Sequence, residues 1–194
     1  MSPLAFDLPI ETSRLVLRPH RMADLDDLAR FHGDPEVVRY VPWPLRDRDA
    51  TEETLRVKLT QTELLAHGQW LVLAVELRTT GQVIGEVLLK WASDQQGELG
   101  FAFARDAQGQ GYAAEAATAM LRLGFDDLGF HRITAVCVAE NDASSRLLRR
   151  LGFRQEGRLV DHVHFKGAWT TQLVFAMLED EWRSRPERRT ERAT

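Results

Sequence analysis

Apolar side chains recur along the middle of this chain at the spacing of β-strands. Residues 70–77 and 83–91 are rich in aliphatic and β-branched side chains, and the turn sequence Arg78-Thr-Thr-Gly-Gln82 separates them. Two such runs joined by a short polar turn predict a β-hairpin. Residues 98–104 have the same character and predict a third strand. The pattern therefore predicts three consecutive antiparallel strands.

Helical spacing precedes these strands. Apolar residues there recur every three or four positions, between polar residues suited to helix caps. Pro42 and Pro44 interrupt this region, because proline removes an N–H donor and restricts its neighbour. In chain order, we expect a strand at residues 14–18, a helix capped by Asp24 and running through Leu25, Leu28 and Phe31, a helical piece at Val37 and Val38, and a helix from Asp49 or Thr51 through Leu55, Leu59 and Leu65 to Gly68.

A strand–helix–strand unit follows the third strand. An apolar stripe from Ala113 to Leu128 predicts a long helix on one side of the sheet. Residues 132–139 are nearly all apolar or β-branched, which is typical of a strand buried on both faces in a parallel pair. Residues 98–139 are therefore interpreted as strand, helix and strand.

A second helix and a last hairpin complete the pattern. Glu140-Asn-Asp-Ala-Ser144 offers several helix caps before a stripe of leucines, and Gly152 is suited to end that helix in a left-handed conformation. Residues 153–165 and 169–178 then predict two strands joined at Lys166-Gly167.

The composition fits one folded domain without a membrane span. The chain has 194 residues, 44% of them hydrophobic, enough for one substantial core over residues 1–182. No run approaches the length of a transmembrane helix, and residues 1–9 lack the pattern of a secretion signal, so we expect a cytoplasmic protein. The single cysteine, Cys137, excludes an internal disulfide, and no cluster with zinc spacing predicts a metal site.

Charge is divided unevenly along the chain. Residues 183–194 contain five arginines and two glutamates and few apolar residues, so we expect a disordered basic tail. Because the net charge is −4, the remainder carries −7. An acidic domain argues against a nucleic-acid partner and mildly favours a cationic one such as an amine.

Two glycines stand at the predicted turn between the third strand and the long helix. Gly109 and Gly111 lack a Cβ, so a ligand can approach the backbone N–H groups at the positive end of a helix. Three interpretations compete. The pair can be a purely structural turn, or a dinucleotide fingerprint, although antiparallel strands before it speak against that fold. A P-loop of the kinase type is excluded, because no Lys-Ser/Thr follows Gly111.

The third interpretation is a resemblance that covers residues 11–182. Five segments resemble, in the right order, the GNAT acetyltransferases and in particular their ribosomal-protein N-terminal acetyltransferase branch. They are Glu11-Thr-x-Arg14-Leu-x-Leu-Arg18, Tyr40-Val-Pro-Trp43, Gln108-x-x-Gly111-x-Ala113 between Glu98-Leu-Gly-Phe101 and Glu115-Ala116, Glu140-Asn141-x-x-Ser144 with Leu151-Gly-Phe153, and Gly167-x-Trp169. In one departure from that branch, Thr170 and Thr171 stand where an acidic residue is usual, which leaves the acceptor open.

The resemblance implies a fold and a cofactor. The fold is a single α/β domain with a mixed, mostly antiparallel sheet, a splayed parallel strand pair and helices on both faces. The acyl donor is acetyl-CoA, with its pantetheine arm between the splayed strands, and no metal takes part. The residues implied to hold it are Phe101, Ala102, Phe103, Arg105, Gln108, Gly109, Gln110, Gly111, Tyr112, Ala113, Asn141 and Ser144. Arg146, Arg149 and Arg150 are further candidates for its phosphates.

Acetyl transfer to an amine needs a neutral amine, a stabilised oxyanion and a proton for the thiolate. An α-amino group of pKa about 8 is about a tenth neutral at pH 7, at a cost of about 1.4 kcal/mol, whereas a lysine costs about 4.6 kcal/mol. Glu98 is the candidate base, directly or through water, with Glu86 and Glu115 as weaker candidates. Ser144 is the candidate proton donor, although Ser144 and Asn141 also suit helix caps. A backbone N–H among residues 101–103 would meet the oxyanion.

The acceptor site is predicted from aromatic residues. Tyr40, Trp43, Trp70 and Trp169 are candidates for its walls, although aromatic residues are by default core residues. The acceptor is a protein N-terminus or a small amine, and the protein is a monomer or a homodimer. The alternative function is a non-catalytic acyl-CoA-binding sensor or assembly module. Cys137 is interpreted as a core residue rather than a nucleophile.

Overall fold

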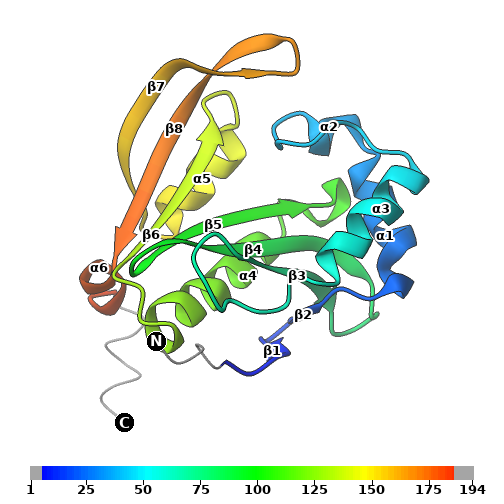
Figure 1. The fold of residues 1–194 in the computed structure, drawn as a ribbon, viewed down its shortest axis with the longest axis horizontal. Coiled ribbons are helices and arrows are strands. Elements are labelled where there is room, and N and C mark those ends of the chain that lie inside the picture. Colours follow the sequence, from blue (N-terminus) through cyan, green and yellow to red (C-terminus); the bar gives the residue numbers. More distant parts are fainter. Residues whose placement is uncertain (1–5, 186–194) are drawn as a thin grey trace.

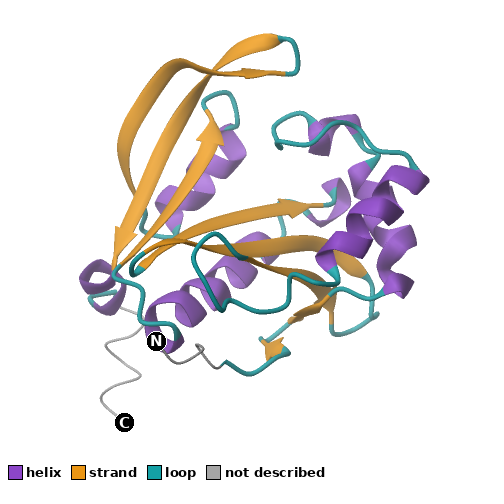
Figure 2. Cartoon of the chain, viewed as in Figure 1, coloured by secondary structure: helices purple, strands orange, loops and turns teal. Residues whose placement is uncertain are grey.

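An eight-stranded mixed sheet organises the protein. The computed structural model describes residues 6–185. Strands lie in the order β1-β2-β3-β4-β5-β6-β8-β7, and all neighbours are antiparallel except β5 and β6. The strands are β1 (Ile10–Glu11), β2 (Leu15–Pro19), β3 (Trp70–Leu77), β4 (Val83–Ser93), β5 (Gln96–Phe103), β6 (Arg132–Val138), β7 (Arg154–Phe165) and β8 (Ala168–Leu178). The predicted α/β fold with a largely antiparallel sheet is confirmed (Figures 1 and 2).

Helices cover both faces of this sheet. Glu86 of β4 faces the helices near the N-terminus, whereas Leu89, three residues on, lies next to Gly124 beside the long central helix, on the opposite face. The helices are α1 (Leu25–His32), α2 (Pro35–Val38), α3 (Arg48–Lys58), α4 (Tyr112–Arg122), α5 (Asp142–Arg150) and α6 (Glu179–Arg183), with short turns η1 (Met22–Asp24) and η2 (Arg105–Ala107) and a π-helical turn η3 (Leu123–Asp127). Figure 1 shows α4 beneath the sheet and α1–α3 together at its far end.

The predicted third helix is too long. It ends at Lys58 rather than continuing to Gly68, and turns at Thr60 and Gln61 follow it. The carbonyl of Gln61 accepts a hydrogen bond from the N–H of Val72, so the chain here runs beside β3. Leu64 is the buried residue of this segment, whereas Leu65, which the helical spacing selected, is half-exposed.

Asp24 occupies the N-cap position of α1, as predicted, but its side chain does not cap this helix. Its carboxylate makes no hydrogen bond to the first turn of α1 and instead accepts from the backbone N–H of Arg21, at the start of η1, and from two nitrogens of the Arg18 guanidinium. An opposite charge within hydrogen-bond reach offers the carboxylate more than a neutral N–H does. Asp24 therefore ties the start of α1 to β2.

The strand β6 is not buried on both faces as predicted. Only its first three residues, 132–134, pair with β5, and its whole length pairs with β8 in the antiparallel sense. Val136 is 43% exposed. Strands β5 and β6, both fully described, are not paired to each other beyond Glu98 and Thr134. Strand β6 therefore leaves the central sheet together with β8 and β7.

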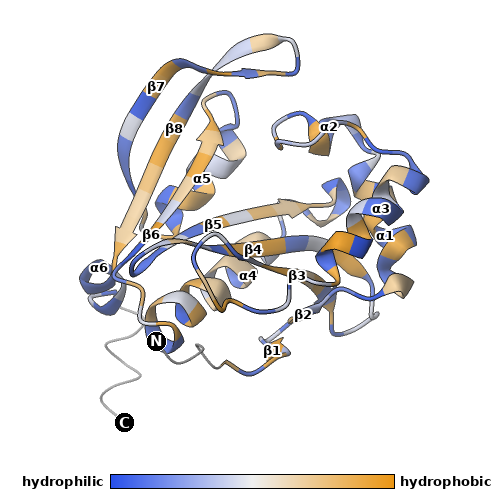
Figure 3. Cartoon of the chain, viewed as in Figure 1, coloured by the Kyte–Doolittle hydropathy of each residue, from blue (hydrophilic) through white to orange (hydrophobic). Residues whose placement is uncertain are grey.

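The last hairpin extends away from the core and returns to α2. It turns at Lys166 and Gly167 as predicted, and the Lys166 ammonium donates to the carbonyl of Val38. In Figure 3, β6 is mainly in hydrophobic colours, whereas β7 alternates between hydrophilic and hydrophobic ones. Of the tail predicted to be disordered, Arg183 is instead the last residue of α6. Residues 186–194 lie outside the described residues.

Candidate functional site

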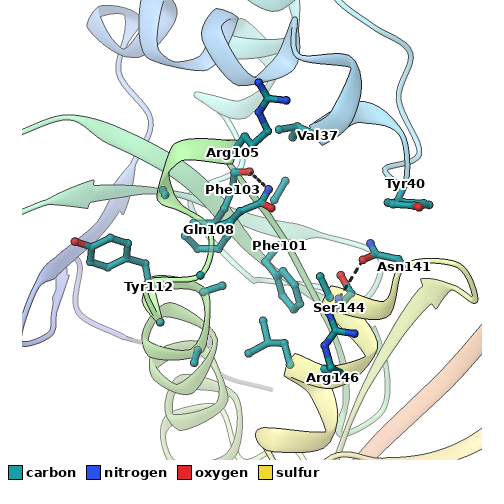
Figure 4. A pocket seen from close by; sticks show the side chains of 18 of the residues that line it. Val37, Tyr40, Phe101, Phe103, Arg105, Gln108, Tyr112, Asn141, Ser144 and Arg146 are labelled. Atoms are coloured by element: carbon teal, nitrogen blue, oxygen red, sulfur yellow. Dashed lines mark hydrogen bonds between the residues drawn. The ribbon is translucent and has the colours of Figure 1, made fainter.

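A cavity of about 810 Å³ opens where β5 and β6 separate. Side chains from β5, the glycine turn, α4, α5 and α2 surround it (Figure 4). Of the residues predicted to hold the acyl donor, it is lined by Phe101, Ala102, Phe103, Arg105, Gln108, Gly109, Gly111, Tyr112, Ala113, Asn141 and Ser144, and Tyr40 joins them from the predicted acceptor set.

Backbone groups of β5 point into the gap between the strands. The N–H of Ala104 donates to β4 at Ile84, and donor direction alternates along a strand. The N–H and C=O groups of Phe101 and Phe103 therefore face away from β4, toward β6. Consistently, the Phe103 carbonyl accepts from the Gln108 side chain on that side, at 3.1 Å.

The two glycines adopt the conformation that their turn requires. Gly109 and Gly111 have φ values of +75° and +82°, a region that residues with a Cβ rarely enter. Gly111 is the N-terminal cap residue of α4, so the unpaired N–H groups of the first turn of this helix lie beside the cavity. A Cβ on Gly109 would meet no atom within 4 Å, so this turn is open to a ligand. The antiparallel β3–β5 before it exclude a doubly wound dinucleotide fold.

The N-terminus of α5 forms the opposite wall. The Asn141 side-chain oxygen accepts from the N–H of Ser144, at 3.0 Å, so Asn141 caps this helix and keeps its amide NH₂ for other partners. Ser144 is not a cap. Its hydroxyl makes no hydrogen bond to another described residue, and Ser144 lines the cavity. Figure 4 shows both residues across from Phe101 and Gln108.

Positive charge is placed at the rim of the cavity. Arg105, Arg146 and Arg150 line it, and their role as phosphate partners stays a prediction. Arg149 does not, since its guanidinium bonds Ser145 and Gln155 and lies over Phe175. Helical spacing could have distinguished Arg149 from the other two, because Arg146 and Arg150 are four residues apart and share a helix face.

Five of the predicted site residues do not line the cavity. Glu98 lies on β5 opposite Lys90, before the strands separate. Gln110 points back, and its amide donates to the Asp106 carbonyl. Trp43 packs against His32 and near Lys58, Trp70 lies under Lys90, and Trp169 is 63% exposed with its ring against His164.

The two weaker base candidates are already occupied. Glu86 is fully buried and paired with Lys58. Burial disfavours its charged form, but the Lys58 charge and the neighbouring His32 outweigh this and hold the pKa of Glu86 below its usual value. Burial likewise opposes ionisation of Glu115, yet hydrogen bonds from Thr12 and Arg14 lower the pKa of Glu115. Neither carboxylate lines the cavity.

Helix α2 and the residues after it form a cavity wall that the sequence pattern did not predict. Glu36, Val37 and Val41 line the cavity together with Tyr40. The Asp34 side chain caps this short helix and Pro35 occupies its first position, which fixes the turn above the cavity. Asp34-Pro35 was the signal that could have located this wall.

Comparison with known proteins matches residues 14–154 to the acetyltransferase (GNAT) domain. The chain belongs to the GNAT acetyltransferase family. Among curated relatives of this GNAT protein is an uncharacterized N-acetyltransferase of Bacillus subtilis (strain 168), YnaD, which is 30% identical over 174 residues, covering 89% of this chain and 98% of the relative. The ribosomal protein uS5 alanine N-acetyltransferase of Escherichia coli (strain K12) is 34% identical over 84 residues, 43% of each chain.

A solved structure extends the likeness. Mycobacterium smegmatis RimJ, determined in complex with CoA-disulfide, has 25% sequence identity to this GNAT chain and a TM-score of 0.77, covering 92% of this chain and 88% of RimJ. The predicted likeness to the ribosomal-protein acetyltransferase branch is thereby confirmed. Within residues 6–185, no group of His, Cys, Asp or Glu is arranged to hold a metal ion, and no helix is long and apolar enough to cross a membrane.

Proposed function

We propose that this chain transfers the acetyl group of acetyl-CoA to a primary amine, by direct attack within a ternary complex. The observation that carries the proposal is the pair of N–H groups at Phe101 and Phe103. They face the open gap between β5 and β6, beside a glycine turn and a helix N-terminus. The reaction needs hydrogen-bond donors for two anionic groups, the pyrophosphate of the acyl donor and the developing oxyanion. One continuous cavity supplies donors for both.

The reaction divides among the residues of this cavity as follows. Gly109, Gly111 and the first turn of α4 bind the pyrophosphate of acetyl-CoA, and the arginines at the rim bind its nucleotide phosphates. The pantetheine arm lies between β5 and β6, where the Asn141 amide donates to it. The thioester carbonyl accepts from a β5 N–H, so that charge developing on its oxygen is stabilised.

Attack of the neutral amine forms the C–N bond and breaks the C–S bond. The proton lost by the amine goes to Glu98 through water, since this carboxylate does not itself line the cavity. The Ser144 hydroxyl donates its proton to the departing thiolate of CoA and takes up a proton from solvent water in turn. The transfer does not pass through Cys137, because burial raises the pKa of this thiol to about 11 and leaves it a poor nucleophile.

The acceptor enters along the wall formed by Tyr40, Val37 and Val41. A protein N-terminus is the favoured acceptor, because an α-amine needs about 3 kcal/mol less help to become neutral than a lysine. The partial likeness to the E. coli ribosomal protein uS5 alanine N-acetyltransferase supports this choice. Trp169, exposed on the hairpin next to His164, is a candidate contact for a larger acceptor.

Thiol release from acetyl-CoA tests the proposal. The purified chain is assayed with a panel of peptides with free N-termini, N-terminally blocked peptides that contain lysine, polyamines and amino acids. Turnover with free N-termini and none with blocked peptides is expected, and turnover only with small amines would change the acceptor. Tight acetyl-CoA binding without turnover on any acceptor would favour the non-catalytic acyl-CoA-binding module instead.

A further inference from the structure

A cluster of hydrogen bonds joins residues 12–14, just before β2, to the first turn of α4. The Glu115 carboxylate in the first turn of α4 accepts from the hydroxyls of Thr12 and Ser13, at 2.6 and 2.9 Å, and from the backbone N–H of Arg14, at 2.9 Å. Its second oxygen accepts from Nε of Arg14, at 2.7 Å. One carboxylate thus anchors three consecutive residues that lie about a hundred positions earlier in the chain.

The Arg14 guanidinium also reaches the turn itself. Its Nη1 donates to the carbonyl of Gln110, at 2.9 Å, and its plane lies over the Tyr112 ring, 4.5 Å from the centroid. Its Nη2 would touch a Cβ placed on Gly111, at 3.4 Å. Arg14 therefore packs along the whole back of the Gln110-Gly-Tyr112 segment.

Holding one carbonyl fixes the direction of the next N–H. In a planar trans peptide, the C=O and the following N–H point in opposite directions. Because Arg14 draws the Gln110 carbonyl to the back of the turn, the N–H of Gly111 is directed to the other side, where Gly111 lines the cavity. The Gln110 side chain, bonded to the Asp106 carbonyl at 2.7 Å, anchors the same residue from a second direction.

We propose that Arg14 and Glu115 are positioning residues that aim the N–H groups of the glycine turn at the pyrophosphate of the acyl donor. The inference rests on the proposed function and adds how its anion site is held ready. Arg14 contributes through orientation rather than through net charge, because Glu115 neutralises it at hydrogen-bond distance. The planar fork of arginine serves Glu115 and Gln110 together, which a lysine ammonium on a flexible stem does not reproduce.

Calorimetric binding of two ligands by the full chain tests this role. Acetyl-CoA carries the pyrophosphate and S-acetylpantetheine does not. Arg14→Lys, Arg14→Met and Glu115→Gln should each weaken acetyl-CoA binding by about tenfold, the scale of one charge-assisted hydrogen bond, and leave S-acetylpantetheine binding unchanged. In steady state the KM for acetyl-CoA should rise while kcat stays near that of the wild type. Arg78→Met is the matched control, since Arg78 is 46% exposed like Arg14 and bonds the Thr12 carbonyl without reaching the turn.

Each outcome decides the inference. Unchanged acetyl-CoA affinity in folded Arg14 variants overturns it, and so does an equal loss for both ligands, which would indicate a general structural defect. Full rescue by Arg14→Lys would overturn the orientation argument in favour of charge. If the wild type binds inorganic pyrophosphate in an Arg14-dependent way but acetylates no amine, the proposed function fails while the inference stands.

Discussion

Lys58 on α3 and Glu86 on β4 form an ion pair inside the protein, with both side chains less than a tenth exposed. Two buried histidines adjoin it, with Nε2 of His32 at 3.7 Å and Nε2 of His20 at 3.8 Å from the Glu86 carboxylate oxygens. The cluster joins α1, α3, β4 and the end of β2 beneath the turn that carries Trp43. It fixes α1 and α3, which come before and after the cavity wall at α2 in the chain.

Breaking this pair from one side should be costly. Glu86→Gln leaves the Lys58 ammonium buried without its counter-charge, and Lys58→Met leaves the carboxylate, so each should lower the free energy of unfolding by about 3–5 kcal/mol. The double variant removes both charges and should lose less than the sum of the two. Urea unfolding of the three variants measures the coupling. Additive losses would show that the pair does not stabilise the fold as a unit.

Acid should weaken the same cluster. Burial lowers the pKa of His20 from 6.5 to about 4, although nearby Glu86 and Asp24 oppose this, while Lys58 and Arg18 add to it. Between these pH values the unfolded chain binds a proton that the folded protein does not. The contribution of His20 to the free energy of unfolding is therefore fully present above pH 6.5 and is lost as the pH falls toward 4. The loss is on the order of 3 kcal/mol.

Histidine substitution identifies the source of this pH dependence. His32, whose pKa burial also lowers, and Glu86, whose folded pKa lies below its unfolded value, act in the same direction. His20→Gln should therefore flatten, but not abolish, the slope of unfolding free energy between pH 6.5 and 4. His67→Gln is the control, since His67 is half-exposed beside Asp94. An equal slope in the wild type and His20→Gln would contradict the assignment.

The cluster around Lys58 and Glu86 shows which features sequence patterns predict and which they do not. The hairpin of β3 and β4, the Gly111 turn and the helix ended by Gly152 were predictable, because local spacing and glycine conformation determine them. The pairing of Lys58 with Glu86 was not, since residues 28 positions apart meet only through the tertiary packing of α3 on β4. For the same reason, residues 11–18 were recognised as a motif while the reach of Arg14 to the glycine turn was not.

Replacing Gly111 should weaken binding of acetyl-CoA. Any side chain at φ +82° strains the backbone by about 1–3 kcal/mol and shifts the N–H groups of the turn. Gly81→Val is the matched control, because Gly81 has a φ of +73° in the remote β3–β4 turn. Both Gly111→Val and Gly81→Val should lose stability to a similar extent, but only the former should lose acetyl-CoA affinity in calorimetry. Wild-type affinity in a folded Gly111→Val protein would remove the anion site from this turn.

Ser144 and Ser145 allow a paired test of the proton donor. Ser144→Ala removes a hydroxyl at the cavity, and we expect kcat to fall by about a hundredfold, the lower end of the range for general acid catalysis, with little change in stability. Ser145 is buried, and its hydroxyl donates to the Asp142 carbonyl at 3.1 Å. Ser145→Ala should therefore lower the melting temperature and leave kcat near that of the wild type. Equal turnover of Ser144→Ala and the wild type would assign protonation of the thiolate to water.

Glu98→Gln tests the base, and its pH dependence separates a chemical role from a structural one. If Glu98 accepts the proton of the attacking amine through water, kcat with an N-terminal peptide should fall at pH 7, where about a tenth of an α-amine is neutral. At pH 9 most of the amine is already neutral, so the deficit should shrink. Glu53→Gln on the exposed side of α3 is the control for loss of one negative charge. Wild-type turnover at pH 7 would eliminate Glu98 as the base, whereas a deficit that stays constant with pH would show that this carboxylate supports β5 at its pairing with Lys90 rather than the proton transfer.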